Sequence, residues 1–107
     1  MKKSLQLVMN EWVENAYDYM QDELKEYYPS YDWKKLRSCQ ADVLETKNFY
    51  VLRSYNTIVA CIRKDCLQSY DFLRMVFGYT ATSAQHISKF FKDYGDSRIM
   101  PYVYRDI

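Results

Sequence analysis

Residues 49–95 constrain the fold more than any other part of the chain, because three strand-length segments there stand directly before a well-marked helix. The segments 49–55, 57–63 and 70–77 are rich in β-branched and aromatic residues, and short polar stretches separate them. Apolar residues predominate in 57–63 instead of alternating, which is typical of a strand buried on both faces. We therefore predict a small antiparallel sheet with 57–63 near its centre.

The helix that follows these segments has a start signal and a stop signal. Thr82 and Gln85 have the spacing of a capping box, in which each side chain satisfies a backbone N–H of the first turn. Gly95 suits the position after the helix, where positive φ is common. Between these signals, apolar residues recur at helical steps and form a stripe that packs on the sheet: Ala84, Ile87, Phe91 and Tyr94.

An amphipathic helix is also predicted at the start of the chain. Ser4 is a suitable N-cap, and the helix runs to about Tyr27. Pro29 ends it, since the proline ring removes a helical hydrogen bond and disfavours helical backbone at the preceding residue. The apolar positions repeat at steps of three and four residues: Leu5, Met9, Trp12, Ala16, Tyr19, Met20 and Tyr27.

The segment 30–39 leaves two interpretations open. It is either a short helical turn capped by Asp32, or a loop that holds Trp33 and Leu36 against the core. Ten residues are too few for the pattern to decide between them.

The remaining segments complete the predicted fold. Residues 41–46 alternate in polarity, and Lys47 and Asn48 are predicted to form a two-residue hairpin turn into the strand at 49–55. Residues 102–104 are short enough to add only an edge strand. We therefore predict a single α+β domain over residues 1–107, with a long N-terminal helix, a three- to four-stranded antiparallel sheet and a C-terminal helix packed on the sheet.

Length and composition limit the class of protein further. A chain of 107 residues can bury one core but not two. Twelve tyrosines and an aromatic fraction of 18% exceed what such a core needs, so some rings are expected to be partly exposed. The net charge of +1 is unevenly distributed: residues 1–32 carry three Lys and seven Asp or Glu, and the rest carries twelve Lys or Arg and seven acids. The domain is therefore electrically polarised.

The cysteines and the N-terminal stretch favour a cytoplasmic location. Cys39, Cys61 and Cys66 form an odd set without a CxxC spacing, which favours reduced thiols over a disulfide framework. No apolar run approaches the roughly 20 residues that cross a membrane, so no membrane contact is expected. Asn10 and Glu11 interrupt the N-terminal stretch before an apolar signal-peptide region can form, and secretion is not expected.

The sequence contains no motif for catalysis or cofactor binding. His86 is the single histidine, which excludes a metal site built from several imidazoles, and it is expected to pack at the boundary of its helix and to hydrogen-bond locally. The two glycines do not form a phosphate-binding loop, and no GxSxG or HExxH signature occurs. A nucleophilic Cys–His pair, formed by His86 with Cys39 or Cys66, is supported only by the residue types. We therefore expect a non-enzymatic protein with no cofactor and no bound metal.

An acidic row on the predicted N-terminal helix is the most distinctive charged feature. At about 100° per residue, its members fall within a sector of roughly 120° opposite the apolar stripe: Glu11, Glu14, Asp18, Asp22 and Glu26. Like charges at i, i+4 destabilise a helix by roughly a few tenths of a kcal/mol per pair, which Lys25 offsets only in part. The row is either a solvated face or a partner-binding surface that imitates nucleic-acid phosphates and occupies a basic channel on another protein.

A second hypothesis uses the basic residues of the predicted sheet. Arg53, Arg63 and Lys64, with Tyr55 and neighbouring aromatic residues, have the chemistry to bind phosphates and stack bases, as in single-strand-binding proteins. The simpler interpretation is that they occupy the outward positions of adjacent strands. A third hypothesis is a structural homo-oligomer that pairs its aromatic surfaces.

Residues 52–60 (LRSYNTIVA) and 79–90 (YTATSAQHISKF) form a pair of motifs within the block 49–95. They resemble a pattern in small uncharacterised proteins of Gram-positive phages and mobile elements, a strand with LxSYxTxVA and then a helix with YSxTTxxHxxKF. The resemblance implies a phage-type accessory protein in a host cytoplasm and no catalytic residues. Small phage proteins with acidic surfaces include anti-CRISPR inhibitors. By this analogy, we expect the acidic row to occupy the basic nucleic-acid channel of a host protein such as a CRISPR nuclease.

Overall fold

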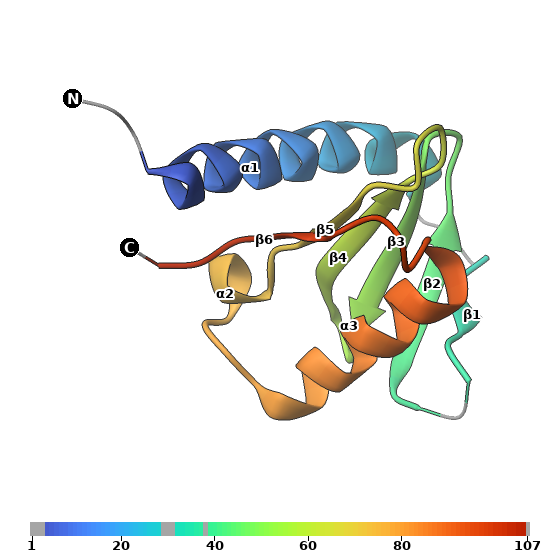
Figure 1. The fold of residues 1–107 in the computed structure, drawn as a ribbon. Coiled ribbons are helices and arrows are strands. Elements are labelled where there is room, and N and C mark those ends of the chain that lie inside the picture. The colour runs from blue at the N-terminus through green and yellow to red at the C-terminus, as the bar shows by residue number, and fades with distance from the viewer. Residues whose placement is uncertain (1–3, 29–31, 38, 107) are drawn as a thin grey trace.

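A computed structural model gives the fold of residues 4–28, 32–37 and 39–106. A six-stranded mixed sheet lies between two helices, α1 (Leu5–Leu24) on one face and α3 (Ala81–Tyr94) on the other (Figure 1). The strands follow their sequence order across the sheet: β1 (Lys34–Lys35), β2 (Ala41–Glu45), β3 (Phe49–Ser54), β4 (Thr57–Arg63), β5 (Ser69–Asp71) and β6 (Tyr102–Val103). The predicted α+β class is confirmed, but the predicted three to four strands were too few.

The β2–β3 hairpin agrees with the sequence prediction. Lys47 and Asn48 form its turn, and the N–H of Thr46 donates to the carbonyl oxygen of Phe49 at 2.8 Å. β4 has β3 and β5 as antiparallel neighbours, which confirms the interior position expected from its apolar sequence. Local sequence patterns were sufficient to predict these strands, because β2, β3 and β4 follow one another directly in the chain.

The predicted strand at 70–77 is wrong beyond Asp71. β5 ends at that residue, and the short helix α2 (Leu73–Val76) follows. The Asp71 carboxylate accepts a hydrogen bond from the backbone N–H of Leu73 at 3.0 Å, a local bond that competes with continued strand pairing. β5 instead pairs in parallel with the edge strand β6, and this pairing makes the sheet mixed.

Both ends of α3 differ in detail from the predicted ends. The N-cap is Thr80 and not Thr82, and its side chain accepts a hydrogen bond from the N–H of Ser83 at 3.3 Å. Gly95 follows the helix as predicted, but its φ of −96° is not left-handed. Glycine is required there for space, because a Cβ would lie 2.7 Å from the carbonyl oxygen of Phe91.

The N-terminal helix begins as predicted and ends slightly earlier. The side chain of Ser4 accepts a hydrogen bond from the N–H of Leu7 at 3.1 Å, which confirms it as the N-cap. α1 ends at Leu24, and a 3-10 turn, η1 (Lys25–Tyr27), continues the chain. The predicted stop at Pro29 lies outside the described residues.

The predicted apolar stripe of α1 is only partly buried. Met20 and Ala16 pack inward, together with Val13, which the predicted stripe did not include. Trp12 and Tyr19 remain 41% and 59% exposed. The helix therefore contacts the sheet along a line rotated away from the two large rings, which confirms that some aromatic residues lie partly in solvent.

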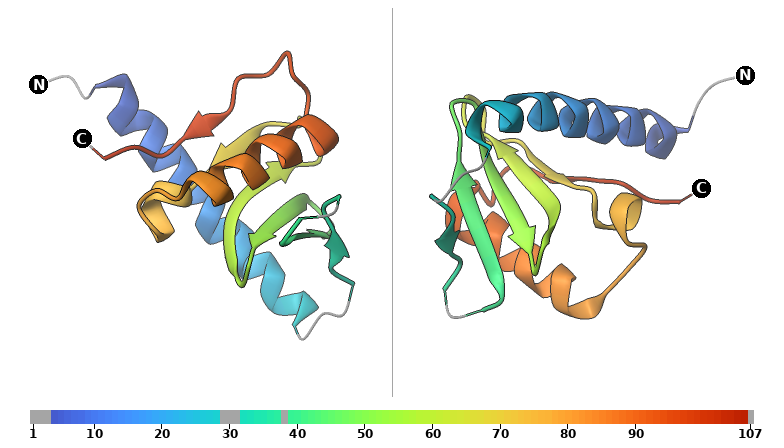
Figure 2. Two further views of the ribbon diagram at one scale, coloured as in Figure 1. Left: turned by 90° about the horizontal axis from the view of Figure 1, so that it is seen from below. Right: turned by 180° about the vertical axis from the view of Figure 1, so that it is seen from behind.

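Two hydrophobic clusters fill the spaces on either side of the sheet, and Figure 2 shows the three layers from below and from behind. The cluster under α1 contains Val13, Ala16, Met20, Phe49, Val51, Cys61, Tyr70 and Phe72. The cluster under α3 contains Leu36, Ala41, Val43, Leu52, Val59, Ala60, Ile62, Leu73, Ile87 and Phe90. None of the helices in the described part of the chain is long and apolar enough to cross a membrane.

The segment before β2 combines features of both predicted alternatives. β1 leads directly to Leu36, which is 2% exposed and belongs to the cluster under α3, whereas Trp33 is half-buried against the cluster under α1. The two side chains are held against the core, but by a short strand and not by a helical turn. Residues 30, 31 and 38 lie outside the described residues.

Candidate functional site

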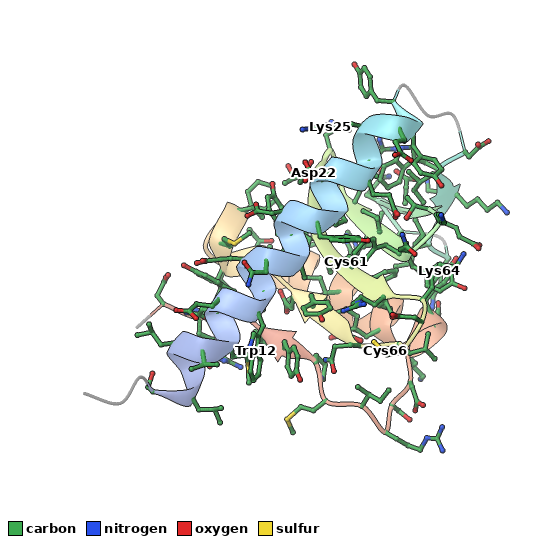
Figure 3. All side chains as sticks on the ribbon, turned by 90° about the horizontal axis from the view of Figure 1, so that it is seen from above. Trp12, Asp22, Lys25, Cys61, Lys64 and Cys66 are labelled. Atoms are coloured by element: carbon green, nitrogen blue, oxygen red, sulfur yellow. The ribbon has the colours of Figure 1, made fainter. Side chains whose placement is uncertain are left out.

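The predicted row of carboxylates lies on the outer side of α1 and η1, away from the sheet. Figure 3 labels one of them, Asp22, on α1. Four of its members are exposed and Glu11 is half-buried. We call this row the acidic face: Glu11, Glu14, Asp18, Asp22 and Glu26. The structure therefore brings together all five residues that the sequence predicted for this surface.

Ion pairs neutralise little of the acidic face. Asp22 pairs with Lys25 at 3.3 Å, but both side chains are 79% exposed, and ion pairs of this kind contribute little to stability. Glu11 interacts within the chain. Glu14, Asp18 and Glu26 form no ion pair with any residue that the structure describes. The middle of the face therefore keeps its negative charge.

Glu23, on the flank of α1 nearest the β2–β3 hairpin, has a different role that the sequence analysis missed. Its carboxylate accepts hydrogen bonds from the hydroxyl of Thr46 and from the backbone and side-chain amides of Asn48, the last two at 3.1 and 2.5 Å. These bonds tie the end of α1 to the hairpin turn. The sequence carries no signal for this contact, because the residues that it joins are 23 and 25 positions apart in the chain and meet only in the tertiary fold.

Arg53, the first of the predicted nucleic-acid-binding residues, is engaged within the fold. Its guanidinium donates to Asp42 at 3.1 Å and lies 4.2 Å from the ring centre of Trp33. Its Nε is buried and has no hydrogen-bond partner among the described residues. Arg53 therefore holds Trp33 against the sheet and is not an open phosphate-binding group.

The other predicted basic residues lie apart from Arg53. Arg63, at the opposite end of β4, pairs with Asp65 at 3.0 Å, and Lys64 pairs with Glu45 at 2.5 Å. The hydrogen bond that Lys64 donates to the carboxylate of Glu45 raises the pKa of Lys64. Tyr55 lies in the β3–β4 turn with a φ of 56°. The structure thus does not assemble the predicted residues into one basic face. Each of the three cations, Arg53, Arg63 and Lys64, already has a carboxylate partner.

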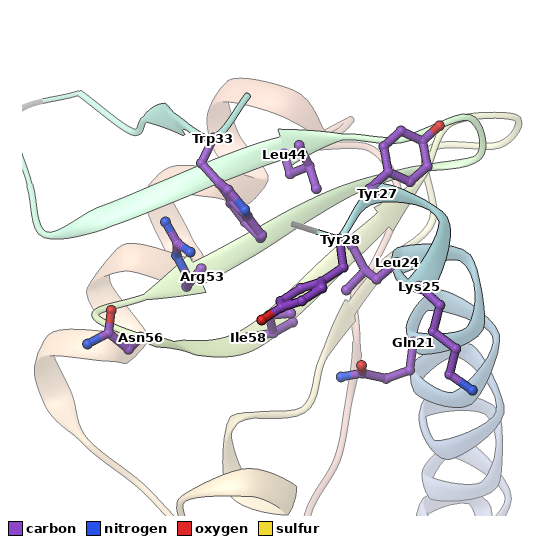
Figure 4. Close-up of a pocket in the computed structure, with 10 residues that line it drawn as sticks. All are labelled: Gln21, Leu24, Lys25, Tyr27, Tyr28, Trp33, Leu44, Arg53, Asn56 and Ile58. Carbon is purple, nitrogen blue, oxygen red and sulfur yellow. The ribbon is translucent and has the colours of Figure 1, made fainter. Parts of the chain in front are cut away.

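A pocket of about 410 Å³ lies beside the C-terminal end of α1, and Figure 4 shows Trp33, Arg53 and Tyr28 around it. Its lining comprises Gln21, Leu24, Lys25, Tyr27, Tyr28, Trp33, Leu44, Arg53, Asn56 and Ile58. Among the described residues that line it there is no carboxylate, histidine or cysteine. The pocket therefore offers apolar contact together with amide, phenol and cationic groups.

A second hollow, of about 430 Å³, lies on the other flank of α1, between the helix and the end of the sheet. We call it the aromatic cleft, and its lining comprises Trp12, Asn15, Ala16, Tyr19, Phe49, Arg63, Tyr70 and Tyr102. Five of these eight side chains are aromatic. The sequence signal for this cleft was the excess of tyrosine. The predicted apolar stripe of α1 included Trp12 and Tyr19, which the structure leaves largely exposed.

His86 is buried in the core and not at the boundary of α3, which corrects the sequence prediction. It is 4% exposed, and its Nδ1 lies 2.8 Å from the hydroxyl of Ser54, which is also 2.9 Å from the hydroxyl of Ser83. Burial lowers the pKa of His86, and the nearby positive charge of Lys89 adds to this effect. Because Ser54 is fully buried, its hydroxyl cannot reach a substrate, and the cluster joins β3 to α3.

The three cysteines lie in different environments: Cys39 is half-buried, Cys61 is buried and Cys66 is exposed. All three are free thiols, and Cys61 is fully buried, which raises the pKa of its thiol. Within residues 4–28, 32–37 and 39–106, no group of three or more His, Cys, Asp or Glu side chains is placed to hold a metal ion.

Comparison with known proteins assigns the sequence to a family. The sequence model of a family of unknown function, DUF8033, matches residues 23–106. The chain belongs to this family. No curated protein and no solved structure matches the chain.

The DUF8033 match covers all six strands, α2 and α3, but only the last two residues of α1. Of the acidic face, it includes only Glu26. The part of the aromatic cleft that α1 supplies also lies outside it. The resemblance of the two motifs to proteins of phages and mobile elements stays a prediction.

Proposed function

We propose that this DUF8033 protein is a non-enzymatic binding protein whose acidic face contacts a basic surface on a partner. The observation that carries this proposal is the contrast in how the two kinds of charge are used. Arg53, Arg63 and Lys64 all have carboxylate partners in the chain, whereas Glu14 and Asp18 have none among the described residues. Of the two predicted binding surfaces, the acidic one is therefore the one whose charges lack partners among the described residues.

The arrangement on the helix makes a cationic partner energetically favourable. Glu14, Asp18, Asp22 and Glu26 follow one another at intervals of four residues, so each carboxylate repels the next. A partner that places lysine or arginine along the row replaces this repulsion with attraction. Charge complementarity of this kind also accelerates association.

In its most specific form, the proposal identifies the basic surface as the nucleic-acid channel of a host protein such as a CRISPR nuclease. Four residues of α-helix rise about 6 Å, so the row presents negative charges at regular steps along a line. A nucleic-acid backbone also presents a linear array of negative charges, and proteins bind it with lysine and arginine. An acidic helix of this kind competes with nucleic acid for the same side chains.

The decisive experiment measures DNA cleavage by purified CRISPR nucleases in the presence of the protein. The protein is expected to inhibit cleavage, and a variant that combines Glu14→Lys, Asp18→Lys and Glu26→Lys is expected to lose inhibition. Inhibition that is unchanged in this variant would remove the acidic face from the proposal. A failure to inhibit any nuclease in the panel would overturn the specific form.

A matched control changes the net charge by the same amount outside the acidic face. Glu45→Lys, Asp65→Lys and Asp106→Lys alter exposed carboxylates, and the two ion pairs that are lost contribute little to stability. This control is expected to inhibit as well as the unchanged protein. A gel shift with single- and double-stranded DNA and RNA is expected to show no binding, and binding that weakens with salt would favour the nucleic-acid-binding alternative.

A further inference from the structure

The aromatic cleft contains a preformed hollow on α1. Ala16 lies one helical turn after Trp12 and one turn before Tyr19, and its small side chain leaves space between the two rings. Two buried rings line the hollow, those of Phe49 and Tyr70, which are 2% and 7% exposed. A large apolar side chain from outside would therefore be enclosed by rings on several sides.

The rings of the cleft are already held in place by other rings. The ring centres of Trp12 and Tyr102 are 5.1 Å apart, those of Tyr19 and Phe49 are 5.5 Å apart, and Tyr70 meets Tyr102 edge-on at 5.7 Å. Side chains that are ordered before binding lose little conformational entropy when a ligand arrives. Rigid, partly exposed tryptophan and tyrosine are also the residues that most often dominate binding energy at interfaces.

A second, acidic hollow adjoins the aromatic cleft at Tyr19, which lines both. It has a volume of about 320 Å³, and its lining comprises Tyr19, Asp22, Glu23, Glu26, Lys47 and Asn48. Glu23 is used by the hairpin turn, but Asp22 and Glu26 are exposed. A cation in this hollow would meet these two carboxylates and the exposed ring of Tyr19.

We infer that the aromatic cleft and the acidic hollow together bind one protein segment, which carries a large apolar side chain near an arginine or lysine. The apolar side chain occupies the space over Ala16, and the cation lies on the far side of Tyr19. This inference rests on the proposed function, since it takes the partner to be basic, and it adds the apolar anchor that the acidic face alone does not specify.

The surroundings of the cleft favour a peptide over a nucleic acid. Asn15 is exposed on its rim, and its side chain makes no hydrogen bond with another described residue, so its amide can pair with a peptide main chain as donor and acceptor. The neighbouring carboxylates Asp18 and Asp22 repel phosphates. Arg63 is the cation in the lining of the cleft, where it pairs with Asp65, and it does not line the acidic hollow.

The test selects ligands from a displayed library of random short peptides, with the full-length protein as bait. Selected peptides are expected to share an arginine or lysine close to a large apolar residue. Tyr19→Ser is expected to abolish selection of the apolar residue, whereas the control Tyr28→Ser, which changes a ring 86% exposed and outside the cleft, is expected to leave it intact.

Trp12 provides a direct readout of where the peptide binds. The chain has two tryptophans, so in a Trp33→Phe background all tryptophan fluorescence comes from the cleft. A selected peptide is expected to change this fluorescence to saturation. Replacing its apolar residue by alanine is expected to weaken binding roughly ten- to a hundredfold, the loss that corresponds to one large side chain leaving a buried site.

The outcomes separate this inference from the proposed function. Peptides that are basic but share no apolar residue, and that bind without a change in Trp12 fluorescence, would overturn the cleft and leave the acidic face as the binding surface. Peptides with no basic residue would overturn both. A change in Trp12 fluorescence caused by single-stranded DNA or RNA, but not by any peptide, would also overturn both.

Discussion

The inner side of α3 and the outer side of α1 use their polar side chains in opposite ways. On α3, the imidazole of His86 is buried and bonded to Ser54 of β3, so that a polar group contributes to the packing of the helix. On the outer side of α1, Glu14 and Asp18 point away from the sheet and form no ion pair among the described residues. The contrast indicates that α3 serves the stability of the fold, whereas the outer side of α1 is available to a partner.

The carboxylates of the molecule show the same difference. Asp93 of α3 pairs in a two-pronged arrangement with Arg37, at 2.8 and 2.6 Å, and the hydrogen bond from Arg37 lowers the pKa of Asp93. Glu23 is held by the hairpin turn. On the acidic face, Asp22 pairs with the exposed Lys25, whereas Glu14, Asp18 and Glu26 form no ion pair among the described residues. Substitutions in the two groups should therefore have different consequences.

The largest expected effect is on the α3 side of the core. Phe90→Ala removes a fully buried ring and is expected to lower the free energy of unfolding by about 3–5 kcal/mol, because it leaves a cavity between α3 and the sheet. Urea denaturation measures the change. Phe91→Ala, at a half-buried neighbouring position, is the control and should cost clearly less. Equal losses would contradict the assignment of Phe90 to the centre of this core.

The second-largest expected effect on stability is the loss of the buried hydroxyl of Ser54 in β3. Ser54→Ala leaves both His86 and Ser83 without their common partner and is expected to lower the free energy of unfolding by about 2 kcal/mol. Ser88→Ala, an exposed serine on the same helix, should change stability by less than about 0.5 kcal/mol. If the two serine variants unfold at the same urea concentration, the polar cluster does not hold α3 to the sheet.

A comparison of two nearby glutamates sharpens the contrast within α1 and η1. Glu23→Gln weakens the hydrogen bonds to Thr46 and Asn48 and is expected to lower the free energy of unfolding by about 1 kcal/mol. Glu26→Gln, with no ion pair among the described residues, should be within about 0.5 kcal/mol of the unchanged protein. A larger loss at Glu26 would show that the outer face is needed for folding.

The pH dependence of stability tests the state of His86. Its pKa is lowered in the folded protein, so the unfolded chain binds the proton more readily, and stability is expected to fall as the pH drops below about 6.5. Denaturation curves are compared for the unchanged protein and His86→Gln between about pH 5.5 and 7.5, around that reference value. The variant should lack this part of the pH dependence, and parallel curves would refute a buried neutral histidine.

The smallest expected effect is a gain. Asp18→Asn removes repulsion with Glu14 and Asp22 at four-residue spacing and is expected to stabilise the protein by roughly a few tenths of a kcal/mol. Paired urea denaturation curves detect a change of this size. Asp93→Asn, which breaks the pair with Arg37, serves as the opposite case and should not stabilise. A stability loss at Asp18 would mean that its charge is used inside the fold.

The features that were predicted correctly depend on residues close together in the chain. The turn at Lys47 and Asn48, the cap at Ser4 and the interior position of β4 all follow from local spacing and composition. The acidic face was predictable for the same reason, because helix periodicity alone places residues four apart on one side. What periodicity did not reveal is which way the helix rotates against the sheet, and Trp12 and Tyr19 were therefore misplaced.

The features that were missed depend on contacts between distant segments. Asn10 of α1 exchanges two hydrogen bonds with the main chain of Arg105, at 2.7 and 3.0 Å, and this holds the C-terminal tail beside the helix. The predicted edge strand at 102–104 is present as β6, but its parallel pairing with β5 was not predicted. Neither residue type nor spacing predicts such a contact, since an asparagine and a short apolar strand can each pair with many different segments.

The sequence by itself determined the α+β class, the hairpin, both main helices and the row of carboxylates, because each of these follows from interactions within a few residues. Only the tertiary structure decided which charges are neutralised, where His86 finds its partner and that two exposed rings form a cleft. The physical reason is that these properties belong to pairs of segments. A side chain becomes buried, paired or exposed only when a distant part of the chain packs against it or leaves it in solvent.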